Sequence, residues 1–359
     1  MSVITAQSEK FLFQYLNNAS PTGYESAGQK LWLDYIHPFV HETGLDNYGT
    51  AYGIINPGKD FRVVIEGHAD EISWFVNFIT DDGFLHLVRN GGSDQMIAPS
   101  KRVNIHTPKG IVKGIFGWPA IHTRSGEDSN LSPKVDNIFI DVGAKNKEEV
   151  LEMGVHVGCV LVYEDEAILL QDRYYVGRAL DNRMGGFCIA EVARLIHENK
   201  LELPYSLYFV NSVQEEIGLR GAEMIAQSIK PNVAIITDVT HDTNTPLISK
   251  KKFGDVKCGN GPSVTYAPAV HNKLLALIIE AATENEIPFQ REAASRRTGT
   301  DTDAFAYSNG GVPSALISLP LRYMHTTVEM AHKDDVNNVI KLIYQSLKKI
   351  EYQHNFKYF

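Results

Sequence analysis

The second half of the chain alternates short apolar runs with amphipathic segments, and this alternation limits the possible folds more than any other feature. The apolar runs, each expected to be a strand, cover residues 206–210, 233–236 and 313–319. Apolar residues recur at helical spacing in residues 184–198, 222–229, 274–285 and 336–350. Strands that are apolar almost throughout are covered on both faces. The pattern therefore predicts an α/β domain whose mostly parallel sheet has helices on both faces.

The N-terminal segment fits the same domain, but the middle of the chain has a different texture. Residues 11–16 and 31–36 have helical periodicity, and two strand-like runs follow before residue 66. Between residues 74 and 167 turns are frequent and helical periodicity is scarce, apart from 147–153. We therefore predict a discontinuous α/β domain of residues 1–73 and 168–359, into which an all-β domain of residues 74–167 is inserted.

The charge balance argues against some classes of partner. The chain has 34 Lys and Arg residues against 43 Asp and Glu residues, a formal charge of -9. Such an acidic chain without a long basic run is poorly suited to bind nucleic acid or an anionic membrane. No uncharged apolar stretch approaches the roughly 20 residues of a membrane-spanning helix. Three widely spaced cysteines, and charged residues close to the N-terminus, favour a cytoplasmic protein.

Histidines and carboxylates follow the apolar runs, at the points where the predicted strands end. Ligands of open α/β sheets bind beyond the carboxyl ends of the strands, so we expect these side chains to meet at one edge of the sheet. One further carboxylate lies in the loop before helix 184–198, whose N-terminus favours negative charge. The residues concerned are His68, Asp70, Asp181, Glu215, Glu216, Asp238 and His325.

This combination of imidazoles and carboxylates, without thiolates, suits zinc, cobalt or manganese. Two neighbouring divalent ions need one bridging carboxylate, and we assign that role to Asp181. We expect His68 and Asp238 to hold one ion. Glu216 and His325 would then hold the other. Paired ions of this kind lie roughly 3.5–4 Å apart and stabilise both the attacking and the leaving group.

Two acidic residues are expected to act without binding a metal. Neighbouring side chains in an extended segment point to different sides, so Glu216 can bind metal while Glu215 stays free as a general base. In the sequence His68-Ala69-Asp70 the two polar side chains share one face. Asp70 can therefore accept the far ring proton of His68 and fix its tautomer.

Each of these features alone has an ordinary structural reading. An isolated His-x-Asp is commonly a turn pair, adjacent glutamates a solvated helix edge, and Asp181 or Asp238 a helix cap. The conjunction favours a metal centre, because five separate strand or helix ends each deliver a suitable ligand. The sequence contains no Gly-x-Ser-x-Gly, phosphate-binding GxxxxGK or GxGxxG motif that would favour another chemistry.

Five segments around these residues resemble metallopeptidase family 42, the glutamyl, deblocking and tetrahedral aminopeptidases. They are residues 67–72, 179–183, 213–222, 238–240 and 322–325, and residues 299–304 resemble an active-site loop of the family. The resemblance implies a fold of the dimetal aminopeptidase and phosphorylase type with an inserted PDZ-like or barrel domain that serves oligomerisation and access. It also implies a cytoplasmic homo-oligomer, from a dimer to a hollow tetrahedral dodecamer, that removes N-terminal residues from short peptides.

Other functions stay open at this point. The same metal centre could serve a deacylase or carboxypeptidase, and some relatives carry a glucanase label. A glycosidase needs two metal-free carboxylates flanking the scissile bond, whereas these carboxylates are better explained as ligands. A binding protein without activity predicts a missing ligand or base, and none is missing. The preferred N-terminal residue cannot be read: Arg296, Arg297 and the run 250–252 either complement an acidic side chain or are surface charge.

Overall fold

The α/β part of the molecule is built on one mixed sheet. The computed structural model describes residues 2–124 and 131–359, and eleven strands of this described part share the sheet. Nine lie side by side in the order β1 (Glu42–Leu45), β2 (Ala51–Ile55), β12 (Ser206–Ser212), β3 (Arg62–His68), β13 (Val233–His241), β16 (Ser314–Arg322), β17 (Glu329–His332), β11 (Tyr174–Gly177) and β10 (Ile168–Leu170). Strands β14 (Ser263–Tyr266) and β15 (Gln290–Ala293) attach beside β16.

Only the centre of the sheet is parallel. Strands β12, β3, β13 and β16 run in one direction, as the apolar runs predict. The flanking pairs in the main order are antiparallel, including β1 with β2 and β10 with β11. Pairs such as β1 with β2 have connections too short for the crossover that a parallel pair needs, whereas β2 with β12 and β11 with β17 join strands far apart in the sequence. The buried centre therefore carries the parallel edge at which the polar residues emerge.

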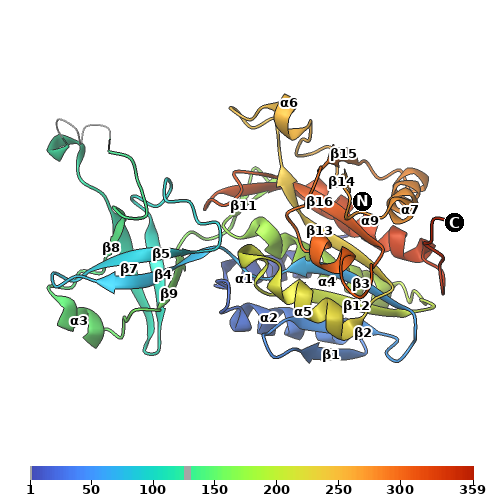
Figure 1. The fold of residues 1–359 in the computed structure, drawn as a ribbon, viewed down its shortest axis with the longest axis horizontal. Helices are drawn as coiled ribbons and strands as arrows, with labels where there is room; N and C mark the ends of the chain where they lie inside the picture. The colour runs from blue at the N-terminus through green and yellow to red at the C-terminus, as the bar shows by residue number, and fades with distance from the viewer. Residues whose placement is uncertain (1, 125–130) are drawn as a thin grey trace.

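Helices cover the sheet in two groups (Figure 1). Helix α4 (Leu180–Glu198) lies against β3, β12 and β13, together with α1 (Ala6–Asn17), α2 (Ser26–Ile36) and α9 (Lys333–Lys349), which itself packs on α7 (Asn272–Glu284). The second group contains α5 (Arg220–Ile229) and α8 (Thr302–Ala306), which contact each other and the central strands. A four-residue helix, α6 (Lys250–Phe253), projects at the top of Figure 1.

The middle of the chain forms a separate closed barrel. Its strands follow the order β4 (Ser73–Ile79), β5 (Phe84–Asn90), β8 (Phe139–Asp141), β7 (Gly110–Gly117), β6 (Arg102–Thr107) and β9 (Val160–Tyr163), with α3 (Lys147–Glu152) beside them. Closure leaves no free strand edge. The barrel has its own core, which includes Trp74, Leu85 and Phe116. The barrel strands run from Ser73 to Tyr163, and the division at residues 74 and 167 stays a prediction.

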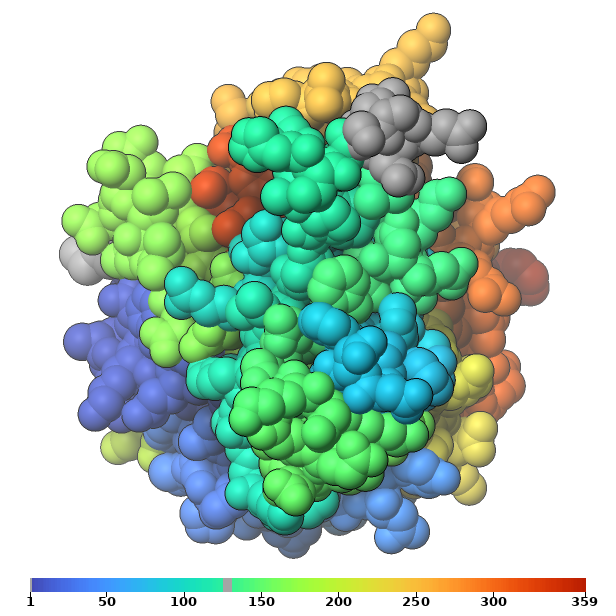
Figure 2. All heavy atoms as spheres, turned by 90° about the vertical axis from the view of Figure 1, so that its left-hand side faces the viewer, coloured from blue at the N-terminus to red at the C-terminus, as the bar shows by residue number. Residues whose placement is uncertain are grey.

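The barrel lies at one end of the molecule (Figure 1) and faces the viewer in Figure 2. Polar contacts tie it to the α/β part. The Lys101 ammonium lies 2.7 Å from a carboxylate oxygen of Asp165 and donates to the hydroxyl of Thr327. The Asn90 side chain donates to the carbonyl of Thr22 at 2.8 Å. Among the residues described here, no helix has both the length and the apolar character that crossing a membrane requires.

Strand β3 and helix α4 approach each other closely because glycines face each other there. A Cβ on Gly67 would lie 2.8 Å from the carbonyl carbon of Gly185 and 3.0 Å from the nitrogen of Gly186. Both obstacles are backbone atoms, which cannot swing aside as a side chain can. The contact brings the first turn of α4, which carries Asp181, beside the end of β3, which carries His68.

We predict that Gly67→Ala lowers the free energy of unfolding by about 1–3 kcal/mol, because overpacking forces the helix away from the strand. Urea denaturation would measure this. Gly53→Ala is the matched control, since its Cβ would meet only the side-chain tips of Val40 and Ile36 at 3.1–3.3 Å. Equal losses in the two variants would contradict the proposed role of the backbone contact.

Candidate metal centre

The five predicted metal ligands lie together at the carboxyl edge of the parallel strands. His68 is the last residue of β3, and Asp238 lies within β13, the next strand across. Asp181 stands in the first turn of α4, while Glu216 and His325 lie on the connections that follow β12 and β16. Several of these connections turn through left-handed, non-glycine residues: Ala179, Gln214 and His325 itself. Such backbone costs energy and tends to occur at functional sites.

Asp181 lies between the two histidines. Its Oδ1 is 3.2 Å from Nε2 of His68, and its Oδ2 is 3.3 Å from Nε2 of His325. One carboxylate thus presents one oxygen to each imidazole. This is the arrangement that a bridging carboxylate between two cations requires.

The remaining carboxylates complete two groups of oxygen and nitrogen donors. Nε2 of His325 lies 3.5 Å from Oε1 of Glu216, and Nε2 of His68 lies 4.0 Å from Oδ1 of Asp238. Donor atoms within 4.8 Å of one another are offered by His68, Asp181 and Glu216 and, in a second set, by His68, Glu215 and Asp238. The donors match divalent zinc, cobalt or manganese in type. Glu215, which we predicted to stay free of metal, also lies close to a predicted ligand: its Oε2 is 3.8 Å from Nε2 of His68.

Asp70 organises more of the centre than the sequence indicated. Its Oδ1 lies 3.3 Å from Nδ1 of His68, where a tautomer-fixing carboxylate is expected. The same carboxylate accepts the backbone N–H groups of Glu215 at 3.0 Å and Glu216 at 3.2 Å, and the hydroxyl of Thr22 at 2.9 Å. Asp70 therefore orients one proposed metal ligand, His68, and holds the turn that presents another, Glu216, together with the proposed base Glu215.

Glu329 is a functional residue that the sequence reasoning missed. It is 2% exposed, and its carboxylate accepts the backbone N–H of Asp181 at 3.1 Å and that of His325 at 2.7 Å. It thereby fixes the separation of these two residues. The only signal for it in the sequence was its position four residues after His325, which by itself predicts nothing.

The inserted barrel also reaches the centre. The loop after β5 places the carbonyl oxygen of Gly92 3.3 Å from Nδ1 of His325. A hydrogen bond donated by Nδ1 to this carbonyl oxygen leaves the lone pair of Nε2 available to bind a metal. A Cβ on Gly92 would lie 2.7 Å from the His325 ring, and one on Gly91 would lie 3.2 Å from the Cβ of Glu216. Only glycines permit this close approach of the barrel.

Burial of several carboxyl groups together dominates the electrostatics. Burial, with the nearby charges of Asp238 and Asp301, raises the pKa of Glu215 to about 11. Burial raises the pKa values of Glu216 and Asp238 to about 8. Burial also opposes ionisation of Asp181, but hydrogen bonds from the two histidines hold its pKa well below the usual value. The two imidazoles are too few to balance these carboxylates, and divalent cations would supply the missing charge.

A second carboxyl pair lies behind His68. The hydroxyl oxygen of Ser212 is 2.6 Å from a carboxyl oxygen of Glu66 and 2.6 Å from one of Asp301. A hydroxyl has a single proton to donate, so both bonds require one carboxyl group to be protonated. Burial and the charge of Asp301 raise the pKa of Glu66 accordingly. Through Asp301, the predicted active-site loop 299–304 thus contacts Ser212 beneath the centre.

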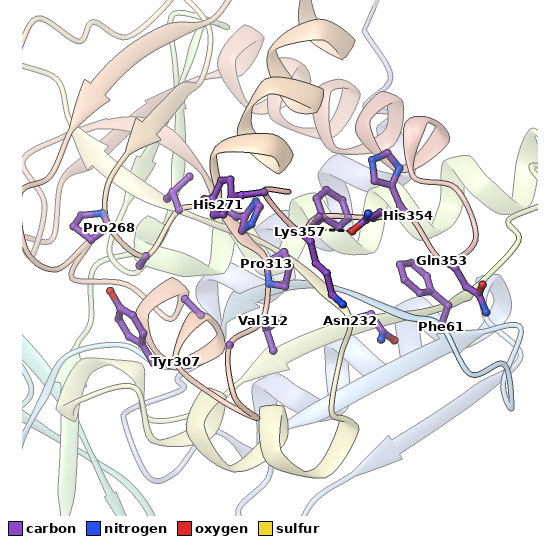
Figure 3. A pocket seen from close by; sticks show the side chains of 17 residues that line it. Phe61, Asn232, Pro268, His271, Tyr307, Val312, Pro313, Gln353, His354 and Lys357 are labelled. Atoms are coloured by element: carbon purple, nitrogen blue, oxygen red, sulfur yellow. Dashed lines mark hydrogen bonds between the residues drawn. The ribbon is translucent and has the colours of Figure 1, made fainter.

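The predicted metal ligands line a cleft of about 520 Å³. Another hollow, of about 720 Å³, lies near Phe61, Asn232 and Pro313 (Figure 3). These residues precede β3, β13 and β16, so this hollow is at the opposite ends of the same strands. Among the described residues that line it, none has an acidic side chain, so it lacks the carboxylates that the cleft provides.

Known proteins share this architecture. The profile of the family described as M42 glutamyl aminopeptidase matches residues 49–342. A lysyl aminopeptidase of Pyrococcus furiosus is 33% identical over 332 residues, which cover 92% of this chain and 94% of the relative. The crystal structure of a TET aminopeptidase from the marine sediment archaeon Thaumarchaeota archaeon SCGC AB-539-E09 superposes with a TM-score of 0.92 at 29% identity, covering 96% of this chain and 97% of the other.

A second solved structure is similar over almost the whole chain. It is a TET1 peptidase of Pyrococcus horikoshii, described as able to assemble into a tetrahedron or a large octahedral shell. Its TM-score is 0.83 at 27% identity, with 94% of this chain and 98% of the other covered. The profile match, the curated relative and the solved structures agree with one another and with the fold described above. The chain belongs to the M42 family of aminopeptidases, which are peptide-bond hydrolases.

Proposed function

We propose that the protein is a dinuclear metal-dependent aminopeptidase that removes N-terminal residues from short peptides. The observation that carries this proposal is the position of Asp181, with one oxygen 3.2 Å from the imidazole of His68 and the other 3.3 Å from that of His325. Asp238 would complete one metal site beside His68. Glu216 would complete the other beside His325.

Two divalent ions at these positions would activate a water molecule and polarise the scissile carbonyl group. The chain's own residues supply proton transfer and positioning. Glu215 is the general base: its carboxylate takes the proton of the attacking water and delivers it to the leaving amine. Its side chain is 11% exposed, so it reaches the cleft while remaining largely shielded from solvent. Asp70 holds its backbone in place through the N–H of Glu215 at 3.0 Å.

The choice of an aminopeptidase over other amide hydrolases rests on the family. A deacylase or carboxypeptidase could use the same ligands, and a glucan hydrolase would need two carboxylates free of metal. An assay that compares a peptide with its N-acetylated and C-amidated forms separates these activities. Loss of cleavage on acetylation alone identifies an aminopeptidase.

We further propose a cytoplasmic homo-oligomer, from a dimer up to a hollow dodecamer. The related TET1 peptidase is described as forming closed shells, which supports an assembly of this chain. The barrel is a suitable contact element, since it stands at one end of the molecule (Figure 1) and exposes Ile111, Ile115 and Ile121. Zinc, cobalt and manganese all suit the proposed ligands.

We predict that Glu215→Gln retains bound metal and lowers kcat by about 10²- to 10⁴-fold, the range expected for loss of a general base. Hydrolysis of aminoacyl-nitroanilides gives kcat, and elemental analysis gives the metal content. Glu202→Gln is the matched control, because Glu202 is exposed and lies outside the cleft. A Glu215→Gln enzyme with normal kcat, or one that has lost its metal, would show that the role is assigned wrongly.

The raised pKa values predict how pH affects the metal-free protein. Glu216 and Asp238 have pKa values of about 8, so between pH 4 and pH 8 the folded chain holds more protons on them than the unfolded chain. Stability therefore falls as pH rises through this window. Divalent ions displace these protons, so their stabilising effect should grow with pH.

Melting temperatures of the chelated protein and of the manganese-loaded protein, measured from pH 5 to pH 9, test this expectation. In the chelated protein, the melting temperature should fall less steeply with rising pH in Glu216→Gln and in Asp238→Asn, because each variant removes one titrating carboxyl group. If both variants decline as steeply as the original protein, the titrating groups lie elsewhere.

A further inference from the structure

The cleft over the metal centre continues into an outer groove of about 910 Å³. Gly218, Leu219, Arg297 and Asp303 line both spaces, so they form the passage between them. Arg220, Glu223 and Arg296 line the outer groove alone. A substrate that has its scissile bond at the metal centre can therefore extend into this groove.

The charges of the outer groove do not cancel. Arg220 lies 3.1 Å from the carboxylate of Glu223 and is thereby paired. The Asp303 carboxylate accepts the backbone N–H groups of Thr298 at 3.0 Å and Gly299 at 3.4 Å. Within the described residues, Arg296 and Arg297 have no carboxylate within 4.0 Å. Two guanidinium groups thus face the groove without a partner.

The loop that carries these arginines is held firmly. Besides the bonds to Asp303, the hydroxyls of Thr298 and Thr300 lie 2.9 Å apart, and that of Thr300 donates to Thr302 at 2.9 Å. Asp301 contacts Ser212 beneath the centre. Arg297 therefore projects from a supported backbone at the passage, as a binding group should. The lysines of α6 line neither space, and Lys250 is paired with Asp255 at 2.6 Å.

The metal-loaded centre leaves the arginines as the uncompensated charge nearby. Five carboxylates line the inner cleft. Asp181, Glu215, Glu216 and Asp238 surround the proposed metal centre and would be balanced by two divalent ions, while the fifth, Asp303, accepts backbone N–H groups of the arginine loop. A peptide's free amine gains nothing beside a guanidinium group, whereas a carboxylate forms charge-assisted, often bidentate hydrogen bonds with it.

We propose that Arg297, assisted by Arg296, binds a carboxylate of the peptide substrate and so determines which peptides are cleaved best. This inference rests on the proposed aminopeptidase function. The carboxylate comes either from an acidic side chain on the N-terminal residue or from the C-terminus of a short peptide, and both present the same chemistry to the arginines.

Two matched substrate pairs distinguish these sources. Glutamyl- and glutaminyl-nitroanilide differ only in the side-chain carboxylate, and neither has a C-terminal carboxylate. The peptide Ala-Ala-Ala and its amide differ only at the C-terminus. The readout is the ratio of kcat/KM values within each pair. We expect one ratio to favour the carboxylate and to fall about tenfold in Arg297→Gln, the size of a lost charge-assisted hydrogen bond.

Further variants test the chemistry. Arg297→Lys keeps the charge and should retain part of the preference, while Arg296→Gln should reduce it less than Arg297→Gln does. The preference should also weaken at high salt. Arg291→Gln is the matched control, because Arg291 is exposed, stacks over the ring of Phe289 at 4.7 Å and lines neither space. Its ratios should equal those of the original protein.

The outcomes separate the two proposals. If no metal-loaded sample cleaves any of the four substrates, the aminopeptidase proposal fails. The carboxylate site is then judged by calorimetric binding of Ala-Ala-Ala, its amide, and the two nitroanilides to Glu215→Gln with and without Arg297→Gln. If the protein cleaves or binds these compounds but favours neither carboxylate, or if Arg297→Gln leaves both ratios unaltered, the inference is overturned.

Discussion

The concentration of buried carboxylates at one edge of the sheet is the constraint on which the rest of the site depends. Asp181, Glu215, Glu216 and Asp238 lie around the imidazoles of His68 and His325. Burial of unbalanced negative charge is costly, and the metal-free chain responds by holding protons on carboxyl groups whose pKa values are raised. The same residues form a strong cation site once those protons leave. A centre of this kind is unfavourable when empty and favourable when loaded, which suits a resident metal.

Holding these side chains in place requires supports from distant parts of the chain. Asp70 binds backbone N–H groups of the turn after β12, and Glu329 binds those of Asp181 and His325. Each support is a carboxylate that accepts backbone N–H groups and so fixes backbone positions, and Asp70 also contacts the ring of His68. Ligand geometry then follows from the backbone. The close packing of β3 against α4 at Gly67 also restricts the backbone that carries His68 and Asp181.

The sequence predicted the central sheet and the convergence of the proposed ligands because both follow from local patterns. Apolar strands locate the sheet, and polar residues at the strand ends locate the edge where His68, Asp238 and Glu216 meet. It did not predict the antiparallel flanks, several of which pair strands far apart in the sequence, such as β2 with β12. Glu329 and the glycine loop of the barrel were also missed, since their contacts join segments far apart in sequence. We predicted a single partner for Asp70, His68, but its carboxylate has several. The others were missed because they depend on the turn at Gln214, whose φ is 58°.

The glycine loop at residues 91 and 92 changes how the barrel should be regarded. Its carbonyl oxygen at Gly92 lies 3.3 Å from Nδ1 of His325. The two hydrophobic cores of the protein are separate, yet the barrel loop contacts a proposed metal ligand of the α/β part. Removing the barrel, or exchanging it for one with a bulkier loop, would alter the surroundings of the His325 imidazole as well as the surface available for assembly. The proposed metal centre thus depends on both domains.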